Sequence, residues 1–479
     1  MKTSFTRAPL LALTGSLAGL MLTPVSASAT GILPQGYPNA ELINDGRRIF
    51  FEETFEGNGR TCGTCHPASN NFTIDPEFIA TLPDDDPLFV AERPQPNPLA
   101  ELENPRLMRE AGLIRENTNG FDAPTTDFTM RSVPHLNALR VSLLAPTNGN
   151  DGTTLPPDQR TGWSGDGAPS DPVGSLSPHG TLRDFTIGAI KQHLTKTLQR
   201  VPGADFRLPG EYELDALEAY MLSLGRQKEF DDFNTIRMMD ARAERGRLNY
   251  MGVGVSGTLN CNACHFNGGA NTNPDFDFPA TVTPPAFELS NRSFAPRVEE
   301  LIDQPGDIID AQGNPFDDGF GHGTSLFNVP TVIEAADSGP FFHANQIDTV
   351  EGMVAFYASK RHLRNGQVLP PIVELNGSQV ANVGAFLRVL NADENVRSAI
   401  ALIKQAELVY TRKDRETNLK IAVSEIEDAI EDLQGGKLHF SDAVPALKKA
   451  RHLAAYPFTM SRARHLLRRI RPMLIKRPG

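Results

Sequence analysis

All four cysteines of this 479-residue chain lie in two short motifs of the form CxxCH. The first is CGTCH at residues 62–66, with Cys62, Cys65 and His66, and the second is CNACH at residues 261–265. This pattern is typical of covalent c-type haem attachment, in which both thiols bond to the haem and the histidine faces the iron. Disulfides or one shared zinc site are alternatives, but neither explains why a histidine directly follows each pair.

The first 29 residues have the composition of an export signal. Lys2 and Arg7 carry positive charge, residues 9–22 are mostly apolar, and residues 27–29 form a small-residue cleavage site. The apolar stretch is short for a bilayer and is interrupted by polar residues. We therefore expect cleavage after Ala29, a mature protein in the periplasm and no membrane span.

The charges are distributed unevenly along the chain. Residues 444–479 contain ten Lys or Arg and no Asp or Glu, whereas residues 30–443 have a net charge of −24. An acidic body with a basic end suggests an electrostatic docking surface, and a solvated helix face is the alternative. Nucleic acid is not an expected partner, because the basic segment has an amphipathic helical pattern and the protein is predicted to be exported.

The two halves of the chain repeat the same features in the same order. Each half has a CxxCH motif, an (S/N)-V-P turn, an aromatic loop, a helix beginning Thr-(Leu/Val) and a closing amphipathic helix. These features begin at residues 62, 131, 163, 180 and 215 in the first half and at residues 261, 327, 340, 348 and 379 in the second. The order predicts a tandem duplication with one haem in each copy.

The run FNVPTVIEAADSGPFFHANQIDTVEGMVAFY at residues 327–357, together with the two CxxCH motifs, resembles the bacterial di-haem cytochrome c peroxidase superfamily. That superfamily includes MauG-type enzymes, which oxidise residues of partner proteins. The approach IFFEETFEG at residues 49–57 is similar to the one typical of its first haem. The resemblance covers residues 44–391 and assigns no function to the helices that follow.

Sparse strand signals predict a mostly α fold with two tandem cytochrome-c-like haem domains and a C-terminal helical extension. The predicted domains are residues 30–230, residues 231–395 and the extension at residues 396–479, which is basic at its end. Two insertions in the first domain, at residues 76–127 and 168–179, are predicted to be surface loops over the first haem, the first with a short helical piece at residues 105–113. Long helices are predicted at residues 396–414, 416–433 and 440–471.

At the second haem, Cys261 and Cys264 would hold the porphyrin and His265 the iron. The resemblance implies that Tyr357 binds the iron from the other side, since MauG-type members have Tyr there and peroxidases have Met. Met353, one helical turn earlier, is the alternative ligand, with Tyr357 then packed in the core. The axial ligand tunes the reduction potential. The resemblance also implies that His343 serves the haem propionates.

At the first haem, alignment of the two repeats places Gly188 or Ala189 where the second copy has Tyr357. Neither residue can bind iron, so an open position and a reactive haem are expected. The alternative is that His135, in the turn RSVPHLNAL, is a sixth ligand.

Trp163 is the only tryptophan in the chain. It matches a superfamily Trp that lies between the two haems, which implies a role as an electron relay. A buried structural Trp is the alternative.

The peroxidatic glutamate of the superfamily is absent, because Thr195 and Phe185 stand at the matching positions. Splitting the O–O bond of peroxide needs a group that moves a proton. The polar candidates nearby are His193, Gln192 and His135. The resemblance further implies a calcium ion between the domains, bound by backbone carbonyls at Ser338 and Pro340.

These features predict a periplasmic di-haem oxidoreductase, cytochrome c peroxidase-like or MauG-like, that reduces hydrogen peroxide at the first haem. Electrons would pass through the second haem and Trp163 from a small redox protein (a cytochrome c or copper protein) or from a protein substrate. The alternatives are a non-enzymatic di-haem electron-transfer cytochrome and a dioxygen-using haem oxygenase of the same superfamily.

Overall fold

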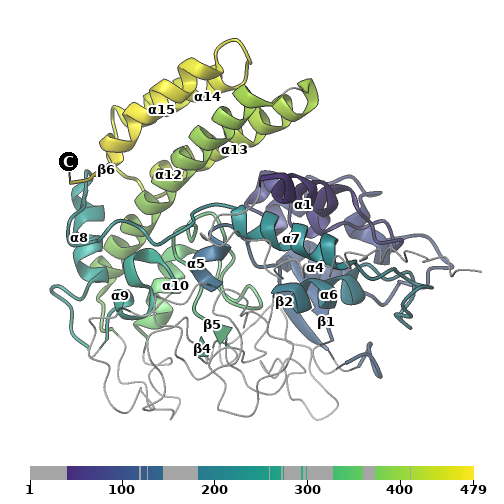
Figure 1. Cartoon of the computed structure of the whole chain (residues 1–479). Helices are drawn as coiled ribbons and strands as arrows, with labels where there is room; N and C mark the ends of the chain where they lie inside the picture. The colour runs from purple at the N-terminus through teal and green to yellow at the C-terminus, as the bar shows by residue number, and fades with distance from the viewer. Residues whose placement is uncertain are drawn as a thin grey trace, which may run out of the picture.

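The described part of the chain is mostly helical, as predicted (Figure 1). The computed structural model describes residues 40–117, 120–126, 128–143, 182–257, 259–270, 273, 293–294, 298, 327–359, 373–409 and 411–478. The predicted export signal, the insertion at residues 168–179 and Trp163 lie outside these residues. No helix among the described residues combines the length and apolar character that a membrane span requires.

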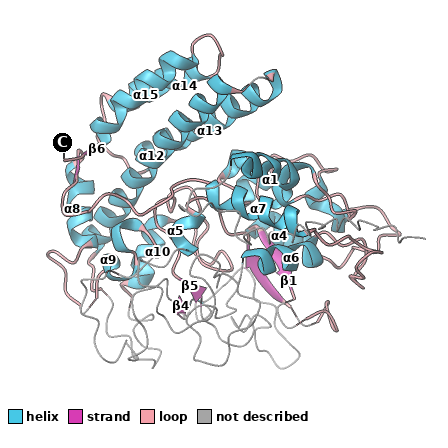
Figure 2. Ribbon diagram, viewed as in Figure 1, coloured by secondary structure: helices cyan, strands magenta, loops and turns pink. Residues whose placement is uncertain are grey.

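The first part of the fold surrounds the first CxxCH motif. Its elements are α1 (Ala40–Glu52), α2 (Cys62–Cys65), η1 (Ala68–Asn70), α3 (Pro76–Ile79), η2 (Pro87–Glu92), α4 (Pro105–Ala111), β1 (Leu113–Glu116), β2 (Thr129–Ser132), α5 (Leu139–Leu143), α6 (Leu182–His193) and α7 (Glu211–Ser223). The strands here are short, and β1 pairs antiparallel with β2 (Figure 2).

The second part surrounds the second CxxCH motif and continues into the extension. Its elements are β3 (Arg237–Met238), α8 (Ala241–Tyr250), α9 (Cys261–Cys264), η4 (Phe266–Gly268), β4 (Ser293–Phe294), β5 (Phe327–Asn328), α10 (Val350–Tyr357), α12 (Gly377–Leu408), α13 (Arg412–Gly435), α14 (Ala443–Ala454), α15 (Met460–Leu474) and β6 (Ile475–Lys476). β6 pairs antiparallel with β3, so the end of the described chain returns to the second part.

Both parts contain the same close helix crossing. A Cβ atom at Gly46 of α1 would lie 1.8 Å from the carbonyl oxygen of Ala216 on α7. Likewise, a Cβ atom at Gly246 of α8 would lie 1.8 Å from the carbonyl oxygen of Asn382 on α12. Such distances are far inside van der Waals contact, so each crossing requires glycine. The repeat seen in the sequence therefore corresponds to a repeated packing of the helix before CxxCH against the closing helix.

The insertion at residues 76–127 is not a surface loop, so that prediction was wrong, although α4 confirms the short helix predicted at residues 105–113. It forms α3, η2, α4 and β1, and it contributes buried side chains to the core around the first motif. The buried apolar residues are Ile79, Leu88, Phe89, Val90, Leu99, Leu102, Leu107, Met108, Leu113 and Ile114. They are spaced among many Pro, Asp and Asn residues, so composition alone concealed their burial.

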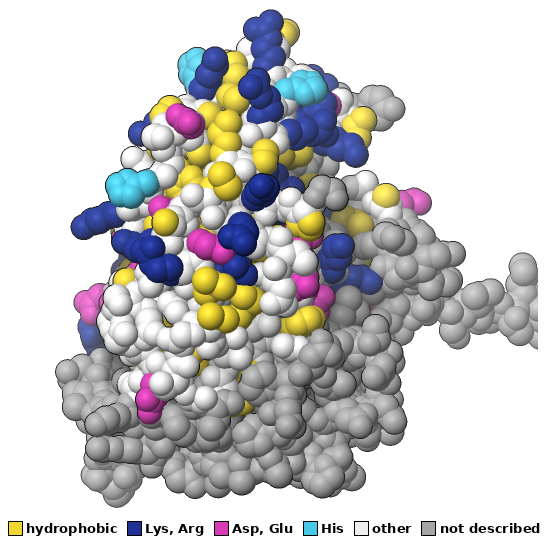
Figure 3. All heavy atoms as spheres, turned by 90° about the vertical axis from the view of Figure 1, so that its left-hand side faces the viewer, with side chains coloured by type: hydrophobic (Ala, Val, Ile, Leu, Met, Phe, Trp, Pro, Cys, Tyr) yellow, Lys and Arg dark blue, Asp and Glu magenta, His cyan; other side chains and the backbone are white. Residues whose placement is uncertain are grey.

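The extension differs from the predicted helices at two points. The predicted boundary at residues 395–396 lies in the middle of α12, a single helix of 32 residues. The helix predicted at residues 440–471 is two helices, α14 and α15, joined by a turn that contains Pro457. In the face that Figure 3 shows, Lys and Arg side chains gather toward the top, on the extension.

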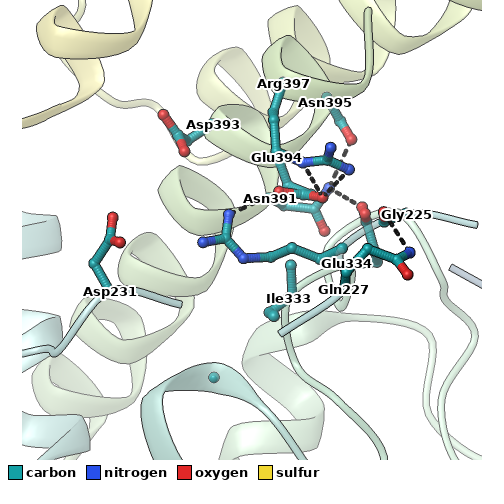
Figure 4. Close-up of polar contacts among 12 residues, drawn as sticks. Gly225, Gln227, Asp231, Ile333, Glu334, Asn391, Asp393, Glu394, Asn395 and Arg397 are labelled. Atoms are coloured by element: carbon teal, nitrogen blue, oxygen red, sulfur yellow. Dashed lines mark hydrogen bonds and ion pairs between the residues drawn. The ribbon is translucent and has the colours of Figure 1, made fainter. Parts of the chain in front are cut away.

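The middle of α12 is polar although it is fully buried. Asn391, Asp393, Glu394 and Asn395 are all 0% exposed. Figure 4 shows Asn391, Glu394 and Asn395 clustered near Glu334, whereas Asp393 points toward a different side of the helix.

Ion pairs from this polar segment reach the other parts of the fold. Glu394 pairs with Arg226, which follows α7, at 3.1 Å. Asp393 pairs with Arg471 of α15 at 2.7 Å and with Arg477 beyond β6. The segment therefore connects the first part, the second part and the extension.

The helix crossing gives a stability prediction. Replacing Gly246 by Ala should lower the free energy of unfolding by about 3 kcal/mol, because the added methyl group forces α8 away from α12. Gly377→Ala is the control, since a Cβ there meets nothing within 4 Å. Denaturant unfolding of both variants measures the difference, and equal stability would contradict the crossing.

Candidate functional site

The two CxxCH motifs face one large cavity. Its volume is about 1340 Å³, and Cys62, Cys65 and His66 line it together with Cys261, Cys264 and His265. A site for one small molecule usually has a volume of about 300–1,000 Å³. The cavity is therefore larger than one such ligand requires, and both motifs contribute to its wall.

Each motif is a single helical turn with its histidine directly behind it. The backbone N–H of His66 donates to the carbonyl of Cys62 at 3.0 Å, and that of His265 donates to Cys261 at 2.9 Å. The first turn is further stabilised by the N–H of Thr61, which donates to the Thr64 hydroxyl at 2.9 Å. The three-residue spacing thus presents both thiols of a motif on one turn.

The two histidines share one hydrogen-bond arrangement. His66 Nδ1 lies 2.7 Å from the carbonyl oxygen of Phe72, and His265 Nδ1 lies 2.8 Å from that of Pro330. Because a carbonyl can only accept, Nδ1 carries the hydrogen in both rings. Burial lowers the pKa of each imidazole to about 4, so both rings are neutral. Each ring then has an unprotonated Nε2, which is the form of histidine that binds a metal ion through Nε2.

The thiols are also in a suitable state for attachment. None of the four cysteines is in a disulfide. Burial raises the pKa of Cys62 and Cys261 to about 12, and that of Cys65 to about 11, so these thiols are protonated. Free thiols in pairs, each followed by an oriented histidine on a shared cavity, fit two c-type haems.

Helix α6 forms the wall of the cavity where the open position of the first haem is predicted. Gly188 and Ala189 both line the cavity, and a Cβ at Gly188 would meet nothing within 4 Å. Gln192 and His135 line it as well. Gln192 Oε1 and His135 Nδ1 are buried without a hydrogen-bond partner in the described part of the chain.

His193 lines the same cavity and lies against a buried ion pair that the sequence did not reveal. Arg60 Nη1 is 2.8 Å from Glu103 Oε1, and both side chains are 0% exposed. Glu103 Oε1 is also 3.8 Å from His193 Nδ1. Burial would raise the pKa of Glu103, but Arg60 and then His193 outweigh it and lower this pKa to about 2. Glu103 is therefore an ionised carboxylate that lies next to His193.

Neither residue at the position of the superfamily glutamate can replace it. Thr195 is fully buried, and its hydroxyl donates to the carbonyl of Thr197 at 2.6 Å. Phe185 lines the cavity with an apolar ring. Glu103 was missed because it lies in the insertion predicted as a surface loop. The apolar residues Leu99 and Leu102 just before it were the available signal.

Helix α10 presents both candidate ligands of the second haem. Tyr357 and Met353 line the cavity, one helical turn apart. The Tyr357 ring lies 5.7 Å from the ring of Phe342, and burial, followed by Cys264 and Cys261, raises the pKa of Tyr357 well above its usual value. Both residues line the cavity, so Tyr357 and Met353 are both candidate ligands of the second haem.

The other predicted residues of this region are at the cavity too. His343, Ser338 and Pro340 line it. The carbonyl oxygen of His343 accepts from the N–H of Ser132, at 2.9 Å, which joins the two parts of the fold. Within the described residues no group of three or more His, Cys, Asp or Glu could hold a metal ion. A calcium site built from carbonyls at Ser338 and Pro340 stays a prediction.

The extension contacts the loop that holds His66. Ser424 of α13 donates its hydroxyl to the carbonyl oxygen of Ser69 in η1, at 3.3 Å. After η1, Asn71 and Phe72 have φ angles of +51° and +57°. Bulky residues rarely adopt this left-handed conformation, so the turn needs support from its surroundings. Helix α13 packs on the segment that supplies the Phe72 carbonyl.

Comparisons with known proteins give little further guidance. No protein-family model and no curated protein matches the chain. Among solved structures the chain is similar to one described as a MauG-like protein associated with microbial copper homeostasis, with 15% sequence identity and a TM-score of 0.35. The match covers 74% of this chain and 91% of that chain. Similarity at this level establishes neither the family nor the function of this protein.

The buried ion pair gives a second stability prediction. Arg60→Leu should lower the free energy of unfolding by about 3–5 kcal/mol, because it leaves Glu103 charged and buried without its partner. Arg106→Leu is the matched control. Arg106 also forms an ion pair, with Glu110 at 3.0 Å, but both side chains are more than 60% exposed. That control should cost less than about 1 kcal/mol. Equal losses in urea unfolding would contradict the prediction.

Proposed function

We propose that this chain is an exported di-haem oxidoreductase that reduces hydrogen peroxide at the first haem, with electrons arriving through the second. The observation that carries the proposal is the pair of neutral histidines whose Nδ1 atoms donate to carbonyls beside free thiol pairs in one cavity. A bound haem iron would supply the change of oxidation state that the reaction needs. Residues 30–230 and 231–395 are then two haem domains, which agrees with their shared helix crossing.

The two haem positions differ in what faces the histidine. Cys62, Cys65 and His66 would hold the first haem, with Gly188 and Ala189 leaving space for peroxide. Cys261, Cys264 and His265 would hold the second, with Tyr357 as the axial ligand and His343 at the propionates. Tyr357 bound at the second haem would block substrate there, so peroxide would react at the first haem.

His193 is the residue proposed to move the proton. Its Nδ1 faces the Glu103 carboxylate, which leaves Nε2 to take a proton from one peroxide oxygen and return it to the other as water leaves. The Glu103 carboxylate lies 3.8 Å from Nδ1 and would not touch peroxide. Gln192 can donate a hydrogen bond in the same part of the cavity.

The remaining elements of the proposal come from the resemblance. Trp163 would relay electrons between the haems, and carbonyls at Ser338 and Pro340 would bind calcium. The electrons would come from a small redox protein, such as a cytochrome c or a copper protein, or from a protein substrate. The protein would work in the periplasm after cleavage at Ala29.

One observation favours a second candidate, a di-haem electron-transfer cytochrome. His135 lines the cavity that His66 also lines, and burial, followed by the proximity of His66, lowers the pKa of His135 to about 4. Its neutral ring with an unpartnered Nδ1 is able to bind iron. With His135 bound, the first haem would have no open position.

Peroxide distinguishes the two candidates. The resting ferric holoprotein should carry two haems, one high-spin and one low-spin, and the high-spin signal should change when peroxide is added. His193→Gln should slow this reaction about 100-fold without changing the haem content, because it removes the group that moves the proton. His452→Gln, an exposed residue of α14, is the control. Two low-spin haems that ignore peroxide, even after one-electron reduction, would favour the electron carrier and refute the proposal.

Substitution at α10 identifies the axial ligand. Tyr357→Phe should change the low-spin signal of the second haem and leave the high-spin signal intact, since it removes the phenol oxygen only. Met353→Leu is the matched substitution one turn earlier and should leave both signals unchanged. Electron paramagnetic resonance of the two variants gives the answer, and the reverse pattern would assign Met353.

A further inference from the structure

The outermost helices of the extension, α14 and α15, bury their apolar sides against the rest of the bundle. The buried residues are Leu447, Ala450 and Ala454 on α14 and Ala463, Leu467, Ile470 and Leu474 on α15. Both helices lie on the side of α12 away from α9 and α10 (Figure 1). Their outer face therefore does not border the cavity, and it consists of the residues between these apolar positions.

This outer face is strongly basic. Its exposed side chains are Lys448, Lys449, His452, Arg462, His465, Arg468 and Arg469. Figure 3 shows Lys and Arg side chains gathered on this part of the molecule. We call these seven residues the basic face.

The positive charges of the basic face are not neutralised by ion pairs within the described part of the chain. The other basic residues of these helices are paired: Arg451 with Glu427 at 3.1 Å, Arg464 with Glu407 at 3.0 Å, and Arg471 with Asp393 at 2.7 Å. The Lys and Arg residues of the basic face form no ion pair with any described residue. No Asp or Glu follows Asp442, so the positive potential of this face is not offset along its own helices.

An aromatic turn stands at one end of the basic face. Between α14 and α15, the side chain of Phe458 is 98% exposed and that of Tyr456 is 55% exposed. Leu408, at the end of α12, is 68% exposed. It lies near the same turn, since Ser461 donates to Glu407 at 2.9 Å. Large apolar side chains held in water beside basic residues are typical of proteins that rest on lipid interfaces.

We propose that the basic face and the turn at Phe458 bind an anionic lipid surface. The Lys and Arg side chains would meet the phosphate groups, and Phe458 would enter the boundary between headgroups and acyl chains. The charges alone would also fit an acidic protein; the exposed Phe458 beside them favours lipid, and the apolar sides of both helices are already covered. Binding is thus peripheral, salt-dependent and independent of the haems, and it leaves α9 and α10 facing away from the lipid.

Sedimentation of the full-length holoprotein with lipid vesicles tests the proposal. The protein should bind vesicles that contain phosphatidylglycerol, bind pure phosphatidylcholine vesicles far less, and dissociate at high salt. Each basic residue near an anionic surface strengthens binding about fivefold, so removing two with Arg468→Glu/Arg469→Glu should lower the partition coefficient at least about 25-fold. Phe458→Ser should lower it about tenfold with the salt dependence unchanged.

Arg245→Glu is the matched control, because Arg245 is an exposed residue of α8 outside the basic face and should leave binding unchanged. Unchanged haem spectra and circular dichroism show that each variant is folded. Equal binding by the double variant, or no binding to phosphatidylglycerol vesicles, would overturn the proposal. So would retention on immobilised polyglutamate without vesicle binding, which assigns the face to an acidic protein, or a salt-sensitive dimer, which assigns it to a second copy.

Discussion

The rest of the structure depends on the charged residues buried in the middle of α12. Burial alone would raise the pKa of Asp393, but Arg471 and Arg477 outweigh burial and lower it. Removing one partner of such a buried pair usually costs about 3–5 kcal/mol. The next residue, Glu394, pairs with Arg226 and with Arg397. Because these ion pairs fix α12 against the first part and the extension, they also fix the wall of the cavity that α12 supports.

The features that sequence could predict are those encoded within a few residues or by repetition. The CxxCH spacing predicted two oriented histidines, and both motifs do line one cavity. The order of motifs predicted a duplication, and Gly46 and Gly246 indeed make the same helix crossing. The mostly α fold followed from sparse strand signals. In each case the signal lies in the type, spacing or order of residues along the chain, which is visible without knowledge of the fold.

The features that sequence could not predict come from residues distant along the chain. Arg60 and Glu103 are 43 positions apart, and Glu103 lies in a segment whose Pro and Asp content indicated a surface loop. Ser424 and Ser69 are 355 positions apart. Tyr357 and Met353 present the opposite problem: they lie one turn apart on the same side of α10, so neither pattern nor geometry separates them. The continuous helix α12 was divided in the prediction because the resemblance ends at residue 391.

The ion pairs of Asp393 also affect the order in which parts of the chain fold during synthesis. Its two arginine partners are synthesised 78 and 84 positions after it, and the strand pairing of Arg237 with Lys476 joins residues still further apart. A chain interrupted before Arg471 would keep a carboxylate in its interior with no countercharge. We therefore expect the second part to complete its folding only together with the extension, and a truncated chain to be unstable in the region that carries the second CxxCH motif.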